Sequence, residues 1–283
     1  MNALRSIGLR SEIAVLRGLS VVEDYADRVV LRTPSEPDFW FGNMVIFREG
    51  RVDPIANIAR FRADFPEARH VTLVWDAPGM AAAPELDRLR AEGFEIDHSD
   101  VLTLGQALGS ASCPAGIVIR PVAREAEWEQ VVALQVETGV EAGHVREDYL
   151  RYVRRRFANR RLQVAEGWGC WFGAFDGDLL VGDLGIFAAD GVARFQDVET
   201  RASHRRRGIC AALVTAGLDW AAAHDPAALP VIIADAESEA GRIYRRCGFV
   251  QCETLIGAYR PPDGAKRPAD QKSIASPPFS QSP

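Results

Sequence analysis

The sequence predicts an α/β protein of the α+β type, in which helices flank a mixed central β-sheet. Three observations favour this class. Short apolar segments alternate with segments of helical periodicity, glycine turns follow several of them, and 47% of the 283 residues are hydrophobic, which is enough to form substantial cores. The length suits one large domain or two small ones.

Loop-forming residues cluster at 105–116 and predict a linker between two domains. The domains are then expected at residues 1–104 and 117–260. Residues 261–283 are rich in proline, serine and glutamine, a composition typical of a disordered tail.

The second domain is predicted to alternate between strands and helices. Its expected elements are, in order, a strand at 117–120, helices at 123–137 and 146–159, strands at 170–175, 179–187 and 193–200, a helix at 211–224, a strand at 231–234, a helix at 239–247 and strands within 249–259. Asp176-Gly177 supplies a hairpin turn between two of the strands. Apolar residues recur at three- and four-residue intervals after Gly208 and predict an apolar stripe along the next helix.

The segment Arg205-Arg206-Arg207-Gly208-Ile209-Cys210 lies between a predicted strand and that helix. Glycine permits a tight strand-to-helix turn, and the first turn of a helix leaves its amide N–H groups without intrahelical partners. These donors, the positive end of the helix dipole and the flanking arginines together predict a binding site for a diphosphate.

This segment has the pattern arginine, two residues, glycine, one residue and a small residue. The pattern resembles the acyl-CoA loop of the GNAT superfamily of N-acetyltransferases. Ala240-x-x-Ile243-Tyr244-x-x-x-Gly248-Phe249 is similar to the penultimate helix and the Gly-Phe turn of that family. The resemblance covers about residues 117–260. It implies the GNAT fold, acetyl-CoA as cosubstrate and an amine of a small molecule or peptide as acceptor, acylated by direct attack.

The resemblance also implies roles for individual residues. Backbone groups of Val198, Glu199 and Thr200 are expected to pair with the pantetheine arm, and an N–H there would meet the developing oxyanion. The hydroxyl of Tyr244 would protonate the departing sulfur. The cofactor-binding candidates are Val198, Glu199, Thr200, Arg205, Arg206, Arg207, Gly208, Ile209, Cys210, Ala211, Glu237 and Tyr244.

Two of these residues depart from the family pattern. Cys210 stands where glycine or alanine is usual, and Glu237 stands where an asparagine often contacts the pantetheine. A thiol at a helix N-terminus could have a depressed pKa and form a covalent acyl-enzyme. The preferred interpretation is that Cys210 fills a small buried space, as free cysteines commonly do.

An amine attacks a thioester only after losing a proton, so a carboxylate near the thioester is needed as a general base. Asp197 and Glu199 lie on the strand before the glycine turn and are the candidates for direct or water-mediated base, with Glu199 preferred. In a regular strand they point to the same face, and a bulge would alter this. The alternative for each is a solvated carboxylate or a structural ion pair.

The first domain is expected to be a degenerate copy of the second. Leu86-x-x-Leu89-x-x-x-Gly93-Phe94 repeats the helix and Gly-Phe order, and a strand at 71–75 precedes it. Trp40-Phe41-Gly42 also recurs as Trp171-Phe172-Gly173. Leu89 replaces the tyrosine, and residues 48–70 contain no arginine-rich glycine turn. This domain is therefore expected to wall the substrate cleft or support the fold, without binding acyl-CoA in the same manner.

Composition excludes several other classes. A net charge of -6 argues against general nucleic-acid binding and against binding to anionic membranes. Five cysteines without a C-x-x-C pair favour free thiols and a cytoplasmic location. The histidines show no metal-ligand spacing, so no metal is expected, and no segment is long and apolar enough to span a membrane. The sequence leaves the oligomeric state open, with a homodimer as one option.

The sequence also allows two functions other than acyl transfer. The first is a non-catalytic acyl-CoA sensor or scaffold, in which the glycine turn binds the cofactor and the first domain contacts a partner. The second is RNA or peptide binding through the basic cluster on the 146–159 helix and just beyond it. Its members are Arg151, Arg154, Arg155, Arg156, Arg160 and Arg161, for which a solvated helix face is the preferred interpretation.

Overall fold

The computed structural model describes residues 4–37, 39–80, 84–105, 113–235 and 239–262. Within these residues the strands form one mixed sheet with the order β1-β2-β3-β4-β11-β5-β10-β9-β8-β7-β6. The strands of the first half are β1 (Val21–Asp24), β2 (Arg28–Arg32), β3 (Met44–Phe47), β4 (Val71–Trp75) and β5 (Glu95–Leu104). Those of the second half are β6 (Ile117–Pro121), β7 (Gly169–Asp176), β8 (Leu179–Ala189), β9 (Val192–Thr200), β10 (Leu229–Asp235) and β11 (Phe249–Arg260).

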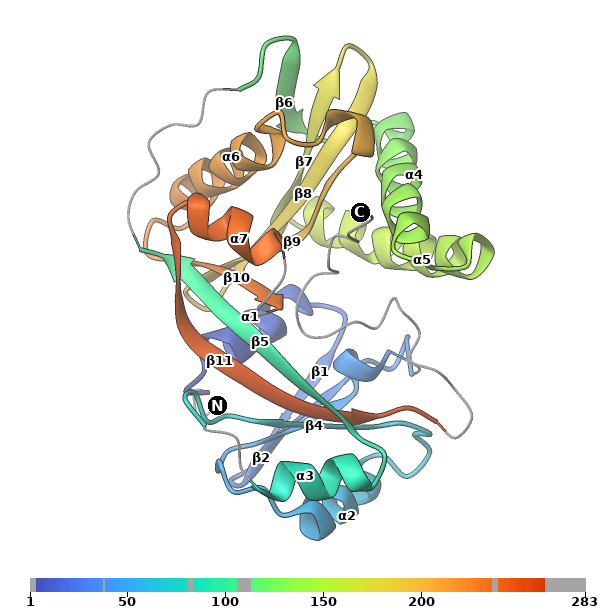
Figure 1. Ribbon diagram of the computed structural model, residues 1–283, viewed down its shortest axis with the longest axis vertical. Coiled ribbons are helices and arrows are strands. Elements are labelled where there is room, and N and C mark those ends of the chain that lie inside the picture. The colour runs from blue at the N-terminus through green and yellow to red at the C-terminus, as the bar shows by residue number, and fades with distance from the viewer. Residues whose placement is uncertain (1–3, 38, 81–83, 106–112, 236–238, 263–283) are drawn as a thin grey trace.

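Helices cover both faces of the sheet (Figure 1). They are α1 (Ile7–Val15), α2 (Pro54–Asp64), α3 (Pro84–Ala91), α4 (Glu125–Glu141), α5 (Arg146–Ala165), α6 (Ile209–His224) and α7 (Glu239–Arg246), with short 3-10 turns η1 (Trp40–Gly42) and η2 (Ala202–His204). The element order expected for the second domain is confirmed. The last segment forms a single strand, β11, with a register shift between Gln251 and Glu253.

The two halves exchange strands at the centre of the sheet. β5 from the first half pairs antiparallel with β10, and β11 from the second half pairs antiparallel with β4. β5 and β11 also pair with each other. As a result β5, from the first half, lies between two strands of the second half, and β11, from the second half, lies between two strands of the first. The division at residues 105–116 therefore stays a prediction, because the halves on either side of it share one sheet.

Three apolar cores follow from this arrangement. The largest lies on the sheet face covered by α1, α4 and α5 and includes residues of both halves, such as Leu9, Trp40, Phe157 and Trp171. The opposite face is covered by α6 and α7 in the second half and by α2 and α3 in the first, with a separate core in each. The largest core therefore packs residues of the two halves against one another.

The internal repeat is confirmed in one place and wrong in another. Helices α3 and α7 are each followed by a glycine with a positive φ, Gly93 at 82° and Gly248 at 82°, and then by a strand that begins at or one residue after a phenylalanine. Trp40-Phe41-Gly42, in contrast, forms the turn η1, whereas Trp171-Phe172-Gly173 lies within strand β7. That three-residue match carries no structural equivalence.

Candidate active site

The strand-to-helix turn before α6 presents an open helix N-terminus. Arg206 and Gly208 have φ values of 62° and 84°, and Arg206, Arg207 and Gly208 are all exposed. Gly208 is the N-cap, and no side chain among the described residues caps the helix. The amide of Ala212 donates to the Gly208 carbonyl at 3.1 Å. The amides that precede Ala212 in the first turn are therefore available to an anion.

The corresponding helix of the first half has a different start. α2 begins with Pro54, and the Asp53 side chain accepts a hydrogen bond from the Ala56 amide. A carboxylate already occupies that helix N-terminus, so it satisfies an orphan donor and repels other anions. The expectation that the first half binds no acyl-CoA through such a turn stays a prediction.

The arginines beside the turn of α6 are not equivalent. Arg205 donates through Nε to the Thr200 carbonyl at 3.0 Å and forms an ion pair with Glu141. Its side chain therefore connects the turn to the end of β9 and to the end of α4. Arg206 and Arg207 are exposed beside the open amides. The nearby His204 pairs with Asp176 at 3.2 Å at the surface.

Strands β9 and β10 separate beside this turn. They pair in parallel at three positions only, where Val192, Ala193 and Arg194 face Leu229, Pro230 and Val231. From Phe195 to Thr200, β9 pairs with β8 along one edge, and no partner strand follows its other edge within the described residues. Thr200 is buried, and its hydroxyl has no hydrogen-bond partner in that part of the chain. The free edge of β9 thus offers unpaired backbone groups to an extended ligand.

The bulge foreseen as a complication is present in β9. Gly185 of β8 faces Gln196 and Asp183 faces Glu199, so two residues of β9 lie opposite one residue of β8. Asp197 takes a φ of 48°, a left-handed value that is uncommon for a residue other than glycine. Asp197 and Glu199 are therefore not related by the regular alternation of a strand.

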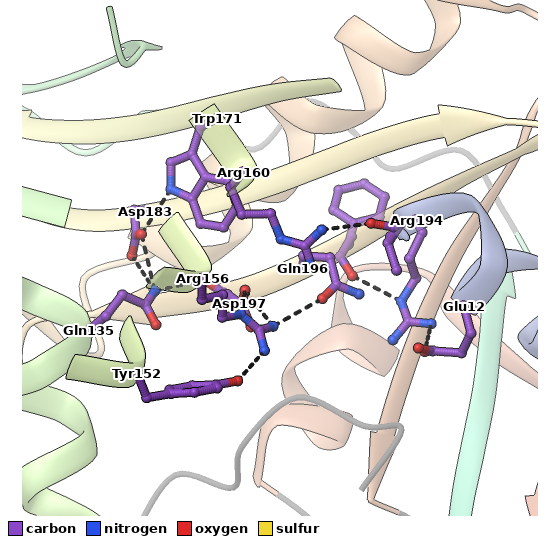
Figure 2. A network of polar contacts seen from close by, with 12 residues as sticks. Glu12, Gln135, Tyr152, Arg156, Arg160, Trp171, Asp183, Arg194, Gln196 and Asp197 are labelled. Carbon is purple, nitrogen blue, oxygen red and sulfur yellow. Dashed lines mark hydrogen bonds and ion pairs between the residues drawn. The ribbon is translucent and has the colours of Figure 1, made fainter. Parts of the chain in front are cut away.

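Asp197 is held by an arginine from α5 (Figure 2). Arg156 donates from Nη2 to both carboxylate oxygens, at 2.7 and 2.8 Å, and from Nε to Oδ2 at 3.1 Å. It also donates to the hydroxyl of Tyr152 at 2.6 Å. The Asp197 carboxylate is engaged in this ion pair, which is the structural alternative named for it above and makes it the weaker candidate for the base.

Glu199 and Asp183 are cross-strand neighbours, and both are buried. Burial raises the pKa of Glu199 to about 8, and the nearby carboxylates of Asp183 and Asp197 add to this. Burial likewise raises the pKa of Asp183 to about 8, against hydrogen bonds from Trp171 and Gln135 that lower it. A carboxyl group whose pKa lies near the working pH can accept a proton from an amine and release it again.

Tyr244 of α7 is buried in the core on the sheet face covered by α6 and α7, and Cys210 of α6 is half-buried and packs against that core. Burial raises the pKa of Tyr244 well above its ordinary value, so the hydroxyl keeps its proton and can donate it. Burial also raises the pKa of Cys210 to about 12, the opposite of the depressed value that a nucleophilic thiol needs. The packing interpretation of Cys210 is the one that fits. Glu237 lies outside the described residues.

The basic cluster on α5 does not form one basic face. Arg151, Arg154 and Arg161 each pair with a surface carboxylate, Asp148, Glu129 and Glu125 respectively. Two other members turn inward. Arg156 binds Asp197, and Arg160 is buried and donates to the Val15 carbonyl at the end of α1 at 2.7 Å. The sequence signal for this was present, because Arg156 and Arg160 flank the apolar stripe of the helix.

A small cavity lies between the two halves beside Arg156. Its volume is about 30 Å³, which accommodates a water molecule or the tip of a ligand. Residues of both halves line it: Leu16, Leu19, Thr33, Glu36 and Phe39 from the first, and Tyr152, Arg156, Asn159 and Arg160 from α5. The first half therefore forms part of the wall of a cavity that reaches Arg156, the ion-pair partner of Asp197.

Among the described residues, no group of three or more His, Cys, Asp or Glu side chains is arranged to hold a metal ion. No helix within the described ranges is long and apolar enough to cross a membrane.

The separated strands and the open helix start define an α/β protein with a strand-turn-helix unit whose first helical turn is uncapped within the described residues. Residues 128–249 match the family model of the acetyltransferase (GNAT) family, so the chain contains a GNAT domain. Acyl transfer is the general activity of that family. No curated protein matches the chain.

Several solved structures share the fold over most of the chain. A functionally unknown conserved protein from Staphylococcus epidermidis ATCC 12228 is 14% identical with a TM-score of 0.69, covering 91% of this chain and 99% of that one. A GCN5-related N-acetyltransferase from Kribbella flavida is 23% identical with a TM-score of 0.61, covering 94% and 98%. A tandem GNAT protein from the clavulanic acid biosynthesis pathway is 14% identical with a TM-score of 0.55, covering 90% and 88%. At these identities the likeness concerns the fold, and a second GNAT-like unit in the first half is compatible with it.

Proposed function

We propose that this protein is an N-acetyltransferase that transfers an acetyl group from acetyl-CoA to the amine of a small molecule or peptide, by direct attack in the second half of the chain. The observation that carries the proposal is the uncapped N-terminus of α6 beside the free edge of β9. A diphosphate would bind the exposed amides at Gly208, and the pantetheine arm would pair with β9 from Val198 to Thr200.

The proposed reaction uses three groups in sequence. Glu199 takes a proton from the acceptor ammonium, directly or through water, and the amine nitrogen then attacks the thioester carbonyl carbon. A backbone N–H of β9 stabilises the oxyanion that forms. When the carbon–sulfur bond breaks, the Tyr244 hydroxyl protonates the departing thiolate. The nitrogen loses its second proton through water, which restores the Tyr244 hydroxyl, and the proton held by Glu199 passes to solvent. The raised pKa of Glu199 and the retained proton of Tyr244 support these roles.

The first half would form the acceptor side of the site. It contributes Thr33, Glu36 and Phe39 to the wall of the cavity that reaches Arg156, the ion-pair partner of Asp197. An acceptor entering between the halves would approach β9 from the face opposite α6. This supports a role of the first half in acceptor binding without cofactor binding of its own.

The alternative is a non-catalytic acyl-CoA sensor, which would use the same turn and the same strand edge. Turnover distinguishes the two functions. Incubation of acetyl-CoA with a panel of amines, followed by detection of free thiol, is expected to show amine-dependent release for the enzyme. A sensor would bind acetyl-CoA and release thiol at the rate of buffer alone.

Cofactor binding is tested at Gly208. Asp and Asn both tolerate a positive φ, and within the described part of the chain an added Cβ would meet only Pro114, at 3.9 Å. Gly208→Asp would cap α6 with a carboxylate, as Asp53 caps α2, and should weaken acetyl-CoA binding at least about tenfold more than Gly208→Asn does. Isothermal titration calorimetry measures both. Equal affinities, or no binding by the unmodified protein, would remove the support for a diphosphate site.

A further inference from the structure

The bulge of β9 depends on two buried side chains that have no sequence signature of their own, Gln135 of α4 and Asp183 of β8. The Gln135 amide donates from Nε2 to the Asp197 carbonyl oxygen at 3.2 Å. The same nitrogen lies 3.3 and 3.1 Å from the two carboxylate oxygens of Asp183. Gln135 therefore joins the bulge of one strand to the carboxyl group of the next (Figure 2).

Asp183 is itself fixed from another direction. The indole Nε1 of Trp171, on β7, donates to Asp183 Oδ2 at 2.9 Å. Asp183 and Trp171 are fully buried, and Gln135 is 4% exposed. A buried amide whose donor is satisfied in this way has one low-energy orientation, because any rotation would leave a polar group without a partner.

Both ends of the strained residue are thus held. Arg156 binds the Asp197 carboxylate from α5, and Gln135 binds its carbonyl from α4. A left-handed conformation at a residue other than glycine is strained and persists only where the surroundings enforce it. These two contacts, from Arg156 and from Gln135, hold the backbone of β9 in its bulged form at Asp197.

The hydrogen bond from Gln135 to the Asp197 carbonyl also fixes the direction of the next backbone N–H, that of Val198. In a trans peptide the carbonyl and the N–H point in opposite directions, and the described residues contain no cis peptide. The Asp197 carbonyl points toward Gln135 on the α4 face, so the Val198 N–H in the same peptide unit points away from α4. The Val198 side chain packs in the core that contains Tyr244, on the face covered by α6 and α7.

We propose that Gln135, held by Asp183 and Trp171, is a positioning residue that aims the Val198 N–H at the carbonyl oxygen of the bound thioester. The inference rests on the proposed function, because it needs an acyl-CoA in the gap between β9 and β10. Gln135 contacts neither substrate. It acts by fixing the peptide that does, and it should affect the reacting carbonyl more than it affects cofactor affinity.

The test uses Gln135→Met, which keeps the length of the side chain and removes its donor. Gln130 provides a matched control on the same helix, since it donates to the Asp178 carbonyl at 3.0 Å and accepts from the Leu180 amide at 2.8 Å, at the β7–β8 turn away from the bulge. Gln130→Met removes a comparable link from α4 to the sheet. Both variants retain every residue assigned to the cofactor.

The measurement is the carbonyl stretching frequency of isotope-labelled acetyl-CoA bound to each protein, by difference infrared spectroscopy. A donor aimed at the oxygen lowers this frequency. Unmodified protein and Gln130→Met should show the lowered frequency, whereas Gln135→Met should lose most of the shift with its Kd for acetyl-CoA changed less than about threefold. With an accepted amine, its kcat should fall about 10–100-fold while KM for acetyl-CoA is kept.

The outcomes separate this inference from the proposed function. If acetyl-CoA does not bind the unmodified protein, both are wrong. If it binds with a lowered frequency and Gln135→Met shows the same frequency and kcat, the positioning role alone is overturned. Equal losses of affinity and frequency in both glutamine variants would also overturn it, because they would show a general loss of structure.

Discussion

Arg156 and Asp197 form a charge-paired contact between helix α5 and the bulge of strand β9, with three nitrogen–oxygen distances between 2.7 and 3.1 Å. The two residues are 41 positions apart in the chain. Asp197 is buried and carries a left-handed φ of 48°. The pair thus connects the α5 helix to the strand on which the proposed chemistry takes place.

Removing the arginine should destabilise the protein. Arg156→Gln leaves the Asp197 carboxylate buried without its cation, and we expect a loss of about 1.5–3 kcal/mol in the free energy of unfolding. Arg154→Gln on the same helix breaks an exposed pair with Glu129 and should cost less than about 0.5 kcal/mol. Urea denaturation followed by circular dichroism measures both. Equal stabilities of the two variants would contradict the role given to Arg156.

Stability should fall as the pH rises through neutrality. Glu199 and Asp183 have ordinary pKa values of 4.5 and 3.8, and burial raises both to about 8 in the folded protein. Between these limits the folded state holds protons that the unfolded state has released. The free energy of unfolding should therefore decrease by up to ~1.4 kcal/mol per pH unit for each group, and the decrease should end above about pH 8.

The control for this effect is Glu199→Gln, which cannot titrate. Its stability measured by denaturation at several pH values should show a shallower decline than that of the unmodified protein. A stability that rises between pH 5 and 8, by ~1 kcal/mol or more, would show that these carboxyl groups are ionised in the folded state.

The activity of the proposed enzyme should show the opposite trend with pH. Glu199 acts as a base only when ionised, so kcat/KM should increase with pH and level off above its pKa of about 8. Glu199→Gln should lower kcat/KM by about 10²–10⁴-fold and remove this rise. The exposed Glu129→Gln is the control and should retain both. A Glu199→Gln enzyme with an unchanged pH profile would exclude Glu199 as the base.

Tyr244 should affect thiol release more than cofactor binding. Tyr244→Phe keeps the buried ring and removes the hydroxyl, so the Kd for acetyl-CoA should stay within about threefold of the original value while turnover falls about 10²-fold or more. Calorimetry and a thiol-release assay give the two quantities. Unchanged turnover would mean that another group protonates the sulfur.

Thermal unfolding should occur in one transition. β5 lies between β10 and β11, and β11 lies between β4 and β5, so neither half can leave the sheet without breaking strand pairs of the other. The core that contains Leu9, Trp40, Phe157 and Trp171 also spans both halves. Differential scanning calorimetry should give equal calorimetric and van't Hoff enthalpies. Two resolved transitions would show that the halves unfold independently.

The sequence was a good guide to local structure. The order of strands and helices in the second half, the hairpin at Asp176-Gly177 and the glycine turn before α6 all follow from nearby residues. These features depend on periodicity and on the freedom of glycine at positive φ, which act over a few residues. The match between Trp40-Phe41-Gly42 and Trp171-Phe172-Gly173 misled, because three residues do not fix a secondary structure against different surroundings.

The tertiary structure decided the properties of the candidate site. Gln135 lies 62 positions before the carbonyl that it binds, and Arg156 lies 41 positions before its carboxylate partner, so no local pattern could relate them. The burial that raises the pKa of Glu199, and the exchange of β5 and β11, likewise arise from segments that meet only in the folded chain. The amino-acid sequence by itself determined which elements form and where a glycine turn precedes α6, the place of the proposed anion site. Long-range packing decided that Asp197 forms an ion pair, that the pKa of Glu199 is raised and that β9 is bulged. The physical reason is that pKa values and backbone strain depend on the groups that are close in space, whatever their distance along the chain.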